Sequence, residues 1–152
     1  MGARRKGREL AVQALYQIEL AGDASEKTME LFWAQAEAGD RAKQFAAELL
    51  EGVHKEHTRI DELINNATEH WKIERLAPVD LCVLRVATNE LLASANPPTS
   101  VILDEAIEIA RRFGTRESRS FVNGVLDAIA QKLGVKDKMG DEPADETPAV
   151  DD

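Results

Sequence analysis

The sequence predicts an all-α protein of about seven helices, and three features of the chain indicate this fold class. Apolar residues recur at intervals of three, four or seven over most of the first 134 positions, as they do on one face of an amphipathic helix. No segment alternates apolar and polar residues over the length of a strand. Glycine and proline stand between the periodic segments, where helices commonly end or begin.

The first two periodic segments predict helices over about 9–21 and 25–39. Gly22 follows the first segment, where a glycine commonly ends a helix, and Ser25 can cap the second. The apolar face of the first helix consists of Ala11, Ala14, Leu15 and Ile18. That of the second consists of Met29, Phe32, Trp33 and Ala36.

Residues 40–64 predict one long third helix, which Asp40 can cap. Its apolar stripe consists of Phe45, Leu49, Val53, Ile60, Leu63 and Ile64, spaced by three, four or seven residues. A short helix is expected near 73–76, within a connecting segment whose pattern is otherwise ambiguous.

Three further helices follow. Pro78 suits the first turn of a helix, because its missing N–H needs no partner there, and the sequence Asn-Pro-Pro ends that helix. Thr99 or Ser100 can cap the next one, and Gly114 stands where a left-handed C-terminal glycine would end it. The last helix ends before Gly134.

The net charge of −9 is distributed unevenly along the chain. Residues 1–8 contain four basic residues and no acid, whereas residues 135–152 contain two lysines and seven acids. The tail has too few apolar residues to offset the entropy of ordering, and we expect it to be disordered. The sequence thus predicts a helical domain at 1–134, with halves at roughly 1–72 and 73–134, and a disordered acidic tail at 135–152.

The residues that catalysis or metal binding would need are scarce. Cys82 lies in an apolar run, so we expect its side chain to be buried. It is also the only cysteine of the sequence and cannot form an internal disulfide, which is consistent with a reducing compartment. His54 and His57 are three residues apart, but a closed metal site needs three or four ligands. No run approaches 18 apolar residues, so no membrane span is expected. We therefore expect a cytoplasmic binding protein with no catalytic residue, metal or cofactor.

Two polar segments favour binding to nucleic acid. The N-terminal cluster of Arg4, Arg5, Lys6 and Arg8 precedes a helix in which Tyr16 lies at the edge of the apolar face. Residues 111–121 bring four arginines, two serines and two phenylalanines to a turn between helices. Arginine contacts phosphate, and aromatic rings stack on unpaired bases. If the N-terminal arm is flexible and makes four phosphate contacts, the salt slope of RNA binding is about −3.

Three segments of the chain resemble the bacterial NusB family. They read ARRKGRELAVQALYQIEL, PVDLCVLRVATNELL and VILDEAIEIARRFGTRESRSFVNGVLDAIA, and the resemblance extends over about residues 3–133. It implies an all-α fold of two three-helix subdomains packed on each other. It also implies a transcription antitermination factor that pairs with the ribosomal protein NusE and binds boxA single-stranded RNA. That complex helps RNA polymerase to read through terminators during ribosomal RNA synthesis.

The resemblance also assigns roles to residues at matching positions. The residues that it implies for RNA binding are Arg4, Arg5, Lys6, Arg8, Tyr16, Glu117, Ser118, Arg119 and Phe121. Asp80 matches an acidic position that contacts NusE. Gly124 is expected to be structural, because a glycine inside a helix costs about 0.5–1 kcal/mol and close helix packing is the simplest compensation.

Two other functions stay open at this point. A domain of this kind also occurs in some RNA methyltransferases, but here the chain leaves no room for a nucleotide-binding fold. The second alternative is a homodimeric protein-interaction module with no RNA role. Binding to boxA-like RNA in the presence of NusE distinguishes this module from an antitermination factor.

Overall fold

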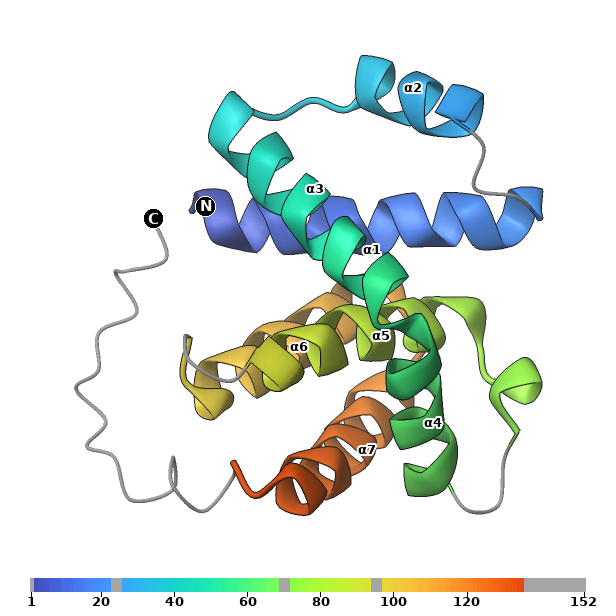
Figure 1. The fold of residues 1–152 in the computed structure, drawn as a ribbon, viewed down its shortest axis with the longest axis vertical. Coiled ribbons are helices and arrows are strands. Elements are labelled where there is room, and N and C mark those ends of the chain that lie inside the picture. Colours follow the sequence, from blue (N-terminus) through green and yellow to red (C-terminus); the bar gives the residue numbers. More distant parts are fainter. Residues whose placement is uncertain (1, 23–25, 69–71, 94–96, 136–152) are drawn as a thin grey trace.

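The computed structural model describes residues 2–22, 26–68, 72–93 and 97–135. These residues form seven α-helices and one short 3-10 helix and contain no strand, so the predicted fold class is confirmed (Figure 1). The elements are α1 (Ala3–Ala21), α2 (Glu26–Gln35), α3 (Asp40–Lys55), α4 (His57–Ala67), η1 (Ile73–Arg75), α5 (Pro78–Ala93), α6 (Thr99–Phe113) and α7 (Ser118–Leu133). None of the described helices has the length and apolar character that crossing a membrane requires.

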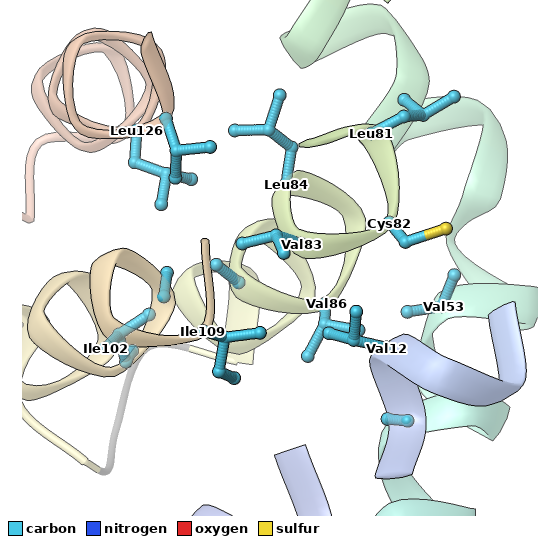
Figure 2. Packing of buried hydrophobic residues seen from close by; sticks show 14 of the residues in the cluster. Val12, Val53, Leu81, Cys82, Val83, Leu84, Val86, Ile102, Ile109 and Leu126 are labelled. Carbon is cyan, nitrogen blue, oxygen red and sulfur yellow. The ribbon is translucent and has the colours of Figure 1, made fainter. Parts of the chain in front are cut away.

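Helix α5 lies at the centre of the fold. Ten of its sixteen residues are buried, as expected for a helix whose apolar residues surround its axis. It packs against α1, α3, α4, α6 and α7. Figure 2 shows Leu84 directed toward Leu126 of α7, while Val86 lies near Ile109 of α6. The core of the protein is therefore organised around α5.

Helices α1 and α3 cross closely at Gly7. A Cβ atom at this position would lie 2.7 Å from Cδ2 of Phe45 and 3.0 Å from the carbonyl oxygen of Ala42. Only a residue without a side chain allows the two backbones to approach this far. The glycine among the basic residues at the start of the chain thus serves helix packing.

The prediction of one long helix over residues 40–64 is wrong, because the chain bends at Glu56 and forms two helices, α3 and α4. This residue has φ −106° and ψ 19°, and α4 continues from it in a new direction. The apolar stripe does not reveal the bend, since Val53 and Ile60 are buried on both sides of it. Arg85 of α5 then ties α4 to the core, donating to both carboxylate oxygens of Asp61 at 3.0 Å.

Helix α4 packs against α5 and α7, and it also contacts α3. The predicted division of the domain into halves near residue 72 stays a prediction. Helix α2 is the least anchored element, because it contributes no buried residue and packs mainly on α1.

The three glycines predicted to end helices, at 22, 114 and 134, each directly follow a helix, but only two of them are left-handed. Gly22 and Gly134 adopt left-handed conformations, with φ 79° and 75°. At the second, Val135 N–H bonds to the carbonyl of Ala130 and closes a Schellman motif. Gly114 differs, since its φ of −99° and ψ of −162° are those of extended backbone.

The predicted caps are not found where the structure describes the helix starts. The N-cap positions of α3 and α6 are Gly39 and Pro98, and neither forms a side-chain cap. Thr99 is instead the first residue of α6. Ser25 and the tail at 136–152 lie outside the described residues.

The expectation that Gly124 lies in close helix packing is also wrong. The residue is exposed in the middle of α7, and a Cβ atom there would meet nothing within 4 Å. No close helix contact therefore compensates for the low helix propensity of glycine at this position.

Candidate nucleic-acid interface

The N-terminal basic cluster belongs to a helix and is not a flexible arm. Helix α1 begins at Ala3, after Gly2 as N-cap, and so includes all four cations. Because an α-helix turns about 100° per residue, the four side chains leave the axis in different directions. Their surroundings therefore differ, and each must be considered separately.

Arg8 is buried and is not available to a ligand. Its side chain is 2% exposed, and its Nε and Nη2 donate to the two carboxylate oxygens of Glu90 at 2.8 and 3.0 Å. Two-point pairing of this kind gives strong, oriented hydrogen bonds. In this structure Arg8 joins α1 to α5, and its expected contact with RNA stays a prediction that would require this pair to open.

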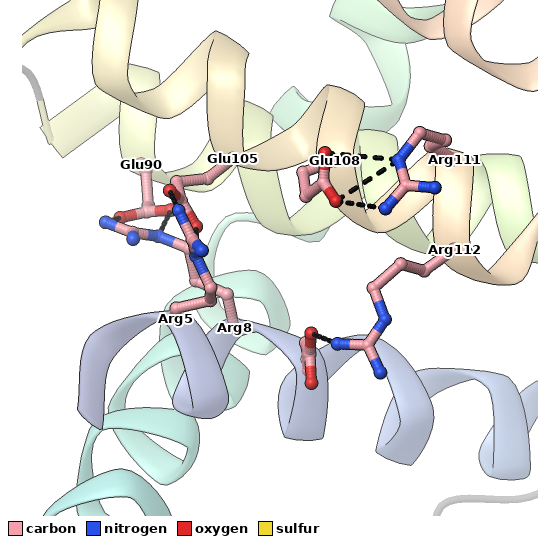
Figure 3. Close-up of polar contacts among 8 residues, drawn as sticks. Arg5, Arg8, Glu90, Glu105, Glu108, Arg111 and Arg112 are labelled. Carbon is pink, nitrogen blue, oxygen red and sulfur yellow. Dashed lines mark hydrogen bonds and ion pairs between the residues drawn. The ribbon is translucent and has the colours of Figure 1, made fainter. Parts of the chain in front are cut away.

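Two further ion pairs bridge α1 and α6, with opposite polarity (Figure 3). Arg5 donates from Nε and Nη2 to Glu105 at 2.9 and 2.7 Å. One turn later the charges are exchanged, and Glu9 of α1 accepts from Nη1 of Arg112. The carboxylates are almost fully buried, whereas the side chains of Arg5 and Arg112 are 45% and 41% exposed.

The exchanged polarity fixes the register of the two helices. A shift of α1 by one turn would bring Glu9 toward Glu105 and place two buried carboxylates together. Like charges in a poorly solvated interface are strongly unfavourable. Arg5 thus contributes to the packing of α1 on α6, and because its side chain is also 45% exposed, its expected contact with RNA stays a prediction.

Arg4 and Lys6 are the two cations of the cluster that form no ion pair within the described ranges. Both are partly exposed, and the guanidinium carbon of Arg4 lies 5.9 Å from the ring centroid of Phe45. Lys6 lines a groove that runs along α1. Of the four cations that the sequence expects to attract phosphate, Arg5 and Arg8 are paired with carboxylates, whereas these two are not within the described ranges.

The groove has a volume of about 640 Å³ and lies between α1, α2 and the adjoining ends of α5 and α6. Tyr16 lines it and is partly buried, as its position at the edge of the apolar face predicted. Among the residues that the structure describes, the lining consists of Lys6, Leu10, Val12, Gln13, Tyr16, Gln17, Phe32, Gln35, Ala36, Glu37, Val79 and Phe113.

The sequence did not identify Phe113 and Gln13 as residues of this site. Phe113 falls on the apolar stripe of its helix and was equally well explained as a core residue, yet it is 36% exposed. The signal of exposure in the sequence is the glycine that directly follows Phe113, which places Phe113 at the end of its helix.

The remaining residues predicted to bind RNA lie at the turn between α6 and α7 and at the start of α7, and they differ in exposure. Ser118 is buried, and its Oγ accepts a hydrogen bond from the N–H of Thr115 at 2.9 Å. Gly114 makes this possible, since a Cβ there would lie 2.4 Å from the same Oγ. Ser118 therefore has a structural role in holding the turn together, and its expected contact with RNA stays a prediction.

Glu117 and Arg119 flank the buried serine and are exposed. Phe121 is partly buried and packs against the core. These three residues stay predicted contacts for RNA, but only the two charged ones present most of their side chain to solvent.

Asp80 lies in the first turn of α5 and is buried. A carboxylate near a helix N-terminus is favourable because the helix dipole is positive there. Its Oδ1 has no hydrogen-bond partner among the residues that the structure describes. The predicted contact with NusE stays a prediction for this residue.

The other reactive groups fit a binding protein. Burial raises the pKa of Cys82 to about 12, so the thiol is neutral and unreactive in the folded protein. His54 and His57 are exposed with stacked rings. Within the described ranges, no group of three or more potential ligands is placed to hold a metal ion.

Comparison with known proteins identifies the family. The family model described as the NusB family matches residues 5–131. The NusB antitermination protein of Sorangium cellulosum is 42% identical over 138 residues, which cover 91% of this chain and 99% of the relative. That of Geobacter sulfurreducens is 45% identical over 134 residues, covering 88% and 97%.

Solved structures agree with this result. NusB of T. maritima superposes with a TM-score of 0.79 at 38% identity, over 90% of this chain and 96% of the other. A complex described as antitermination factors NusB and NusE with double-stranded RNA has a TM-score of 0.73, over 86% of this chain and 97% of that one. At 23% identity the second likeness concerns the fold alone. The curated relatives are antitermination proteins rather than enzymes, as the scarcity of reactive groups predicted. This chain belongs to the NusB family of transcription antitermination proteins.

Proposed function

We propose that this protein binds the boxA element of nascent ribosomal RNA as a single strand, together with the ribosomal protein NusE. The complex then acts on RNA polymerase to promote read-through of terminators. The observation that carries the proposal is the groove along α1, where Tyr16 and Phe113 lie with Lys6 in one surface. Family membership supports the same function, because the curated relatives are antitermination proteins.

In this proposal the RNA-binding face divides into two parts. Arg4, Lys6 and Arg119 attract phosphate, which contributes affinity but little sequence information. Tyr16 and Phe121 contact bases, and Glu117 accepts hydrogen bonds from their edges. Two N-terminal phosphate contacts, instead of four, contribute about −1.4 to the salt slope.

The partner surface is proposed to include the start of α5. The buried Oδ1 of Asp80 has no hydrogen-bond partner among the described residues, and a donor from NusE would satisfy it. The solved complex of a relative with NusE supports the choice of partner.

Fluorescence anisotropy of a labelled boxA RNA and a scrambled control tests the proposal. The protein is titrated alone and then with NusE, at several salt concentrations. We expect NusE to tighten boxA binding strongly and to have little effect on the scrambled RNA. Equal affinity for both RNAs, or no binding even with NusE, would contradict the proposed function.

One observation favours the homodimeric interaction module as a second candidate. Leu20 at the end of α1 and Leu31 on α2 are 64% and 55% exposed, the largest values for big apolar side chains in the described chain. Light scattering across a concentration series tests for a dimer. A dimer that does not bind boxA RNA with NusE present would favour this candidate.

A further inference from the structure

We propose that the groove along α1 is a pocket for one unstacked nucleobase, and that Phe113 and Gln13 are further RNA-binding residues within it. The inference rests on the proposed function and adds a specific site to it. Of the residues that line this groove, the sequence assigned Lys6 and Tyr16 to RNA binding.

The size and lining of the groove suit a base with its attached phosphate. Its volume of about 640 Å³ lies within the range of roughly 300–1,000 Å³ that is typical of ligand pockets. Aromatic side chains come from three helices, namely Tyr16, Phe32 and Phe113. Aromatic rings offer stacking surfaces to any base, whereas amide side chains can read its edge.

The groove residues that belong to α1 follow one another along the helix axis. Gln13, Tyr16 and Gln17 are spaced by three and four residues and so lie on one face of the helix. Lys6 lies two turns before Gln13, about 10 Å along the axis. The pocket therefore has a cation at one end, where a phosphate can be bound, and amides with an aromatic ring at the other.

Phe113 is held in place although it is exposed. The guanidinium carbon of Arg112 lies 5.2 Å from the centroid of the ring. Arg112 is fixed in turn by its ion pair with the buried Glu9 (Figure 3). A ring that is already ordered loses little entropy when it stacks on a ligand.

The polar lining favours a base over an apolar side chain of a protein partner. Leu10, Val12 and Val79 supply apolar surface, but three glutamines line the same groove. An apolar side chain would take these amides out of water without giving them a hydrogen-bond partner. A nucleobase presents donors and acceptors on its edge together with an apolar face, so it can satisfy both kinds of surface.

A double-mutant cycle between protein and RNA tests the inference. Affinity is measured for a short boxA RNA and for versions in which one nucleotide at a time is made abasic. The proteins are the wild type, Phe113→Ala, Gln13→Ala and the control Leu31→Ala, which removes an exposed apolar side chain outside the groove. Thermal melts followed by circular dichroism show whether each variant is folded.

We expect Phe113→Ala to weaken binding of the intact RNA by at least about fivefold, the lower limit for loss of one stacked base. One abasic position should weaken the wild type similarly, and the same position should cost the Phe113→Ala variant little more. The Leu31→Ala control should bind every RNA as the wild type does. If Phe113→Ala fails to fold, Gln13→Ala, whose side chain is on the groove wall, completes the same cycle.

Four results would overturn the inference. Variants that bind intact boxA as the wild type does would leave the proposed function in place and remove the pocket. Abasic losses that are equal in variant and wild type would do the same. Loss of NusE binding with RNA binding unchanged would assign the groove to a protein partner. A wild type that binds no boxA RNA, even with NusE, would overturn the proposed function and this inference together.

Discussion

Replacing Arg8 with alanine should destabilise the fold rather than weaken RNA binding directly. The substitution leaves the carboxylate of Glu90, which is 7% exposed, without its two hydrogen bonds from the guanidinium. Removing one partner of a buried ion pair typically costs about 3–5 kcal/mol. For a domain of this size that free energy corresponds to a decrease in Tm of roughly 12–20 °C.

Urea and thermal denaturation, followed by circular dichroism, measure this effect. Arg4→Ala is the matched control, because Arg4 lies one turn earlier and is partly exposed. We expect the control to change the free energy of unfolding by less than about 1 kcal/mol. The double replacement Arg8→Met with Glu90→Leu should recover most of the lost stability, since a buried pair can often be exchanged for apolar residues.

The reasoning would be refuted by an Arg8→Ala variant that unfolds with the wild-type midpoint. Refutation would also follow if this variant kept its stability but reduced the salt slope of RNA binding by about 0.7, the value for one phosphate contact. In that case Arg8 would leave Glu90 to bind RNA.

Four further predictions follow from the structure. Gly124→Ala should raise the free energy of unfolding by about 0.5–1 kcal/mol in urea titrations, because the position is exposed and a Cβ there meets no other atom; a loss of stability would show a hidden packing role. Replacing Arg4 and Lys6 together with alanine should reduce the salt slope of boxA binding by about 1.4 without lowering helicity; an unchanged slope would remove both from the site. Tyr16→Asp should weaken RNA binding more than NusE binding, as titrations with each ligand will show; equal losses would mean that the tyrosine is structural. Cys82, with its pKa raised to about 12 by burial, should resist thiol reagents at pH 8 in the native protein and react after denaturation; rapid labelling of the native state would contradict its burial.

Local patterns predicted the helices well because amphipathic periodicity is a property of neighbouring residues. The sequence predicted a helix that starts at Pro78, as α5 does, and the glycines at 22 and 134 marked true helix ends. The bend at Glu56 was missed because buried residues before and after it keep the same spacing. Periodicity reports which residues face a core and not whether the axis changes direction between them.

The candidate site was predicted less completely, because the positions of its charges depend on residues far apart in the chain. Nothing near Arg8 in the sequence shows that Glu90 neutralises it. Ser118 is a residue type that often contacts phosphate, but here it is buried. Its hydroxyl fits beside Gly114 because that residue has no side chain. The spacing of Phe113 left a core position and a nucleic-acid contact equally open, because spacing does not show that the residue lies exposed at the end of its helix.

The ion pairs of α1 also constrain when this helix can reach its final state during synthesis. The partners of Arg8, Arg5 and Glu9 lie 82, 100 and 103 positions later in the chain. Helix α1 is therefore synthesised before the partners of its charged residues, and all three contacts can be complete only after α6 has been synthesised. Contacts of such long range also slow folding, since a large loop must close before they form.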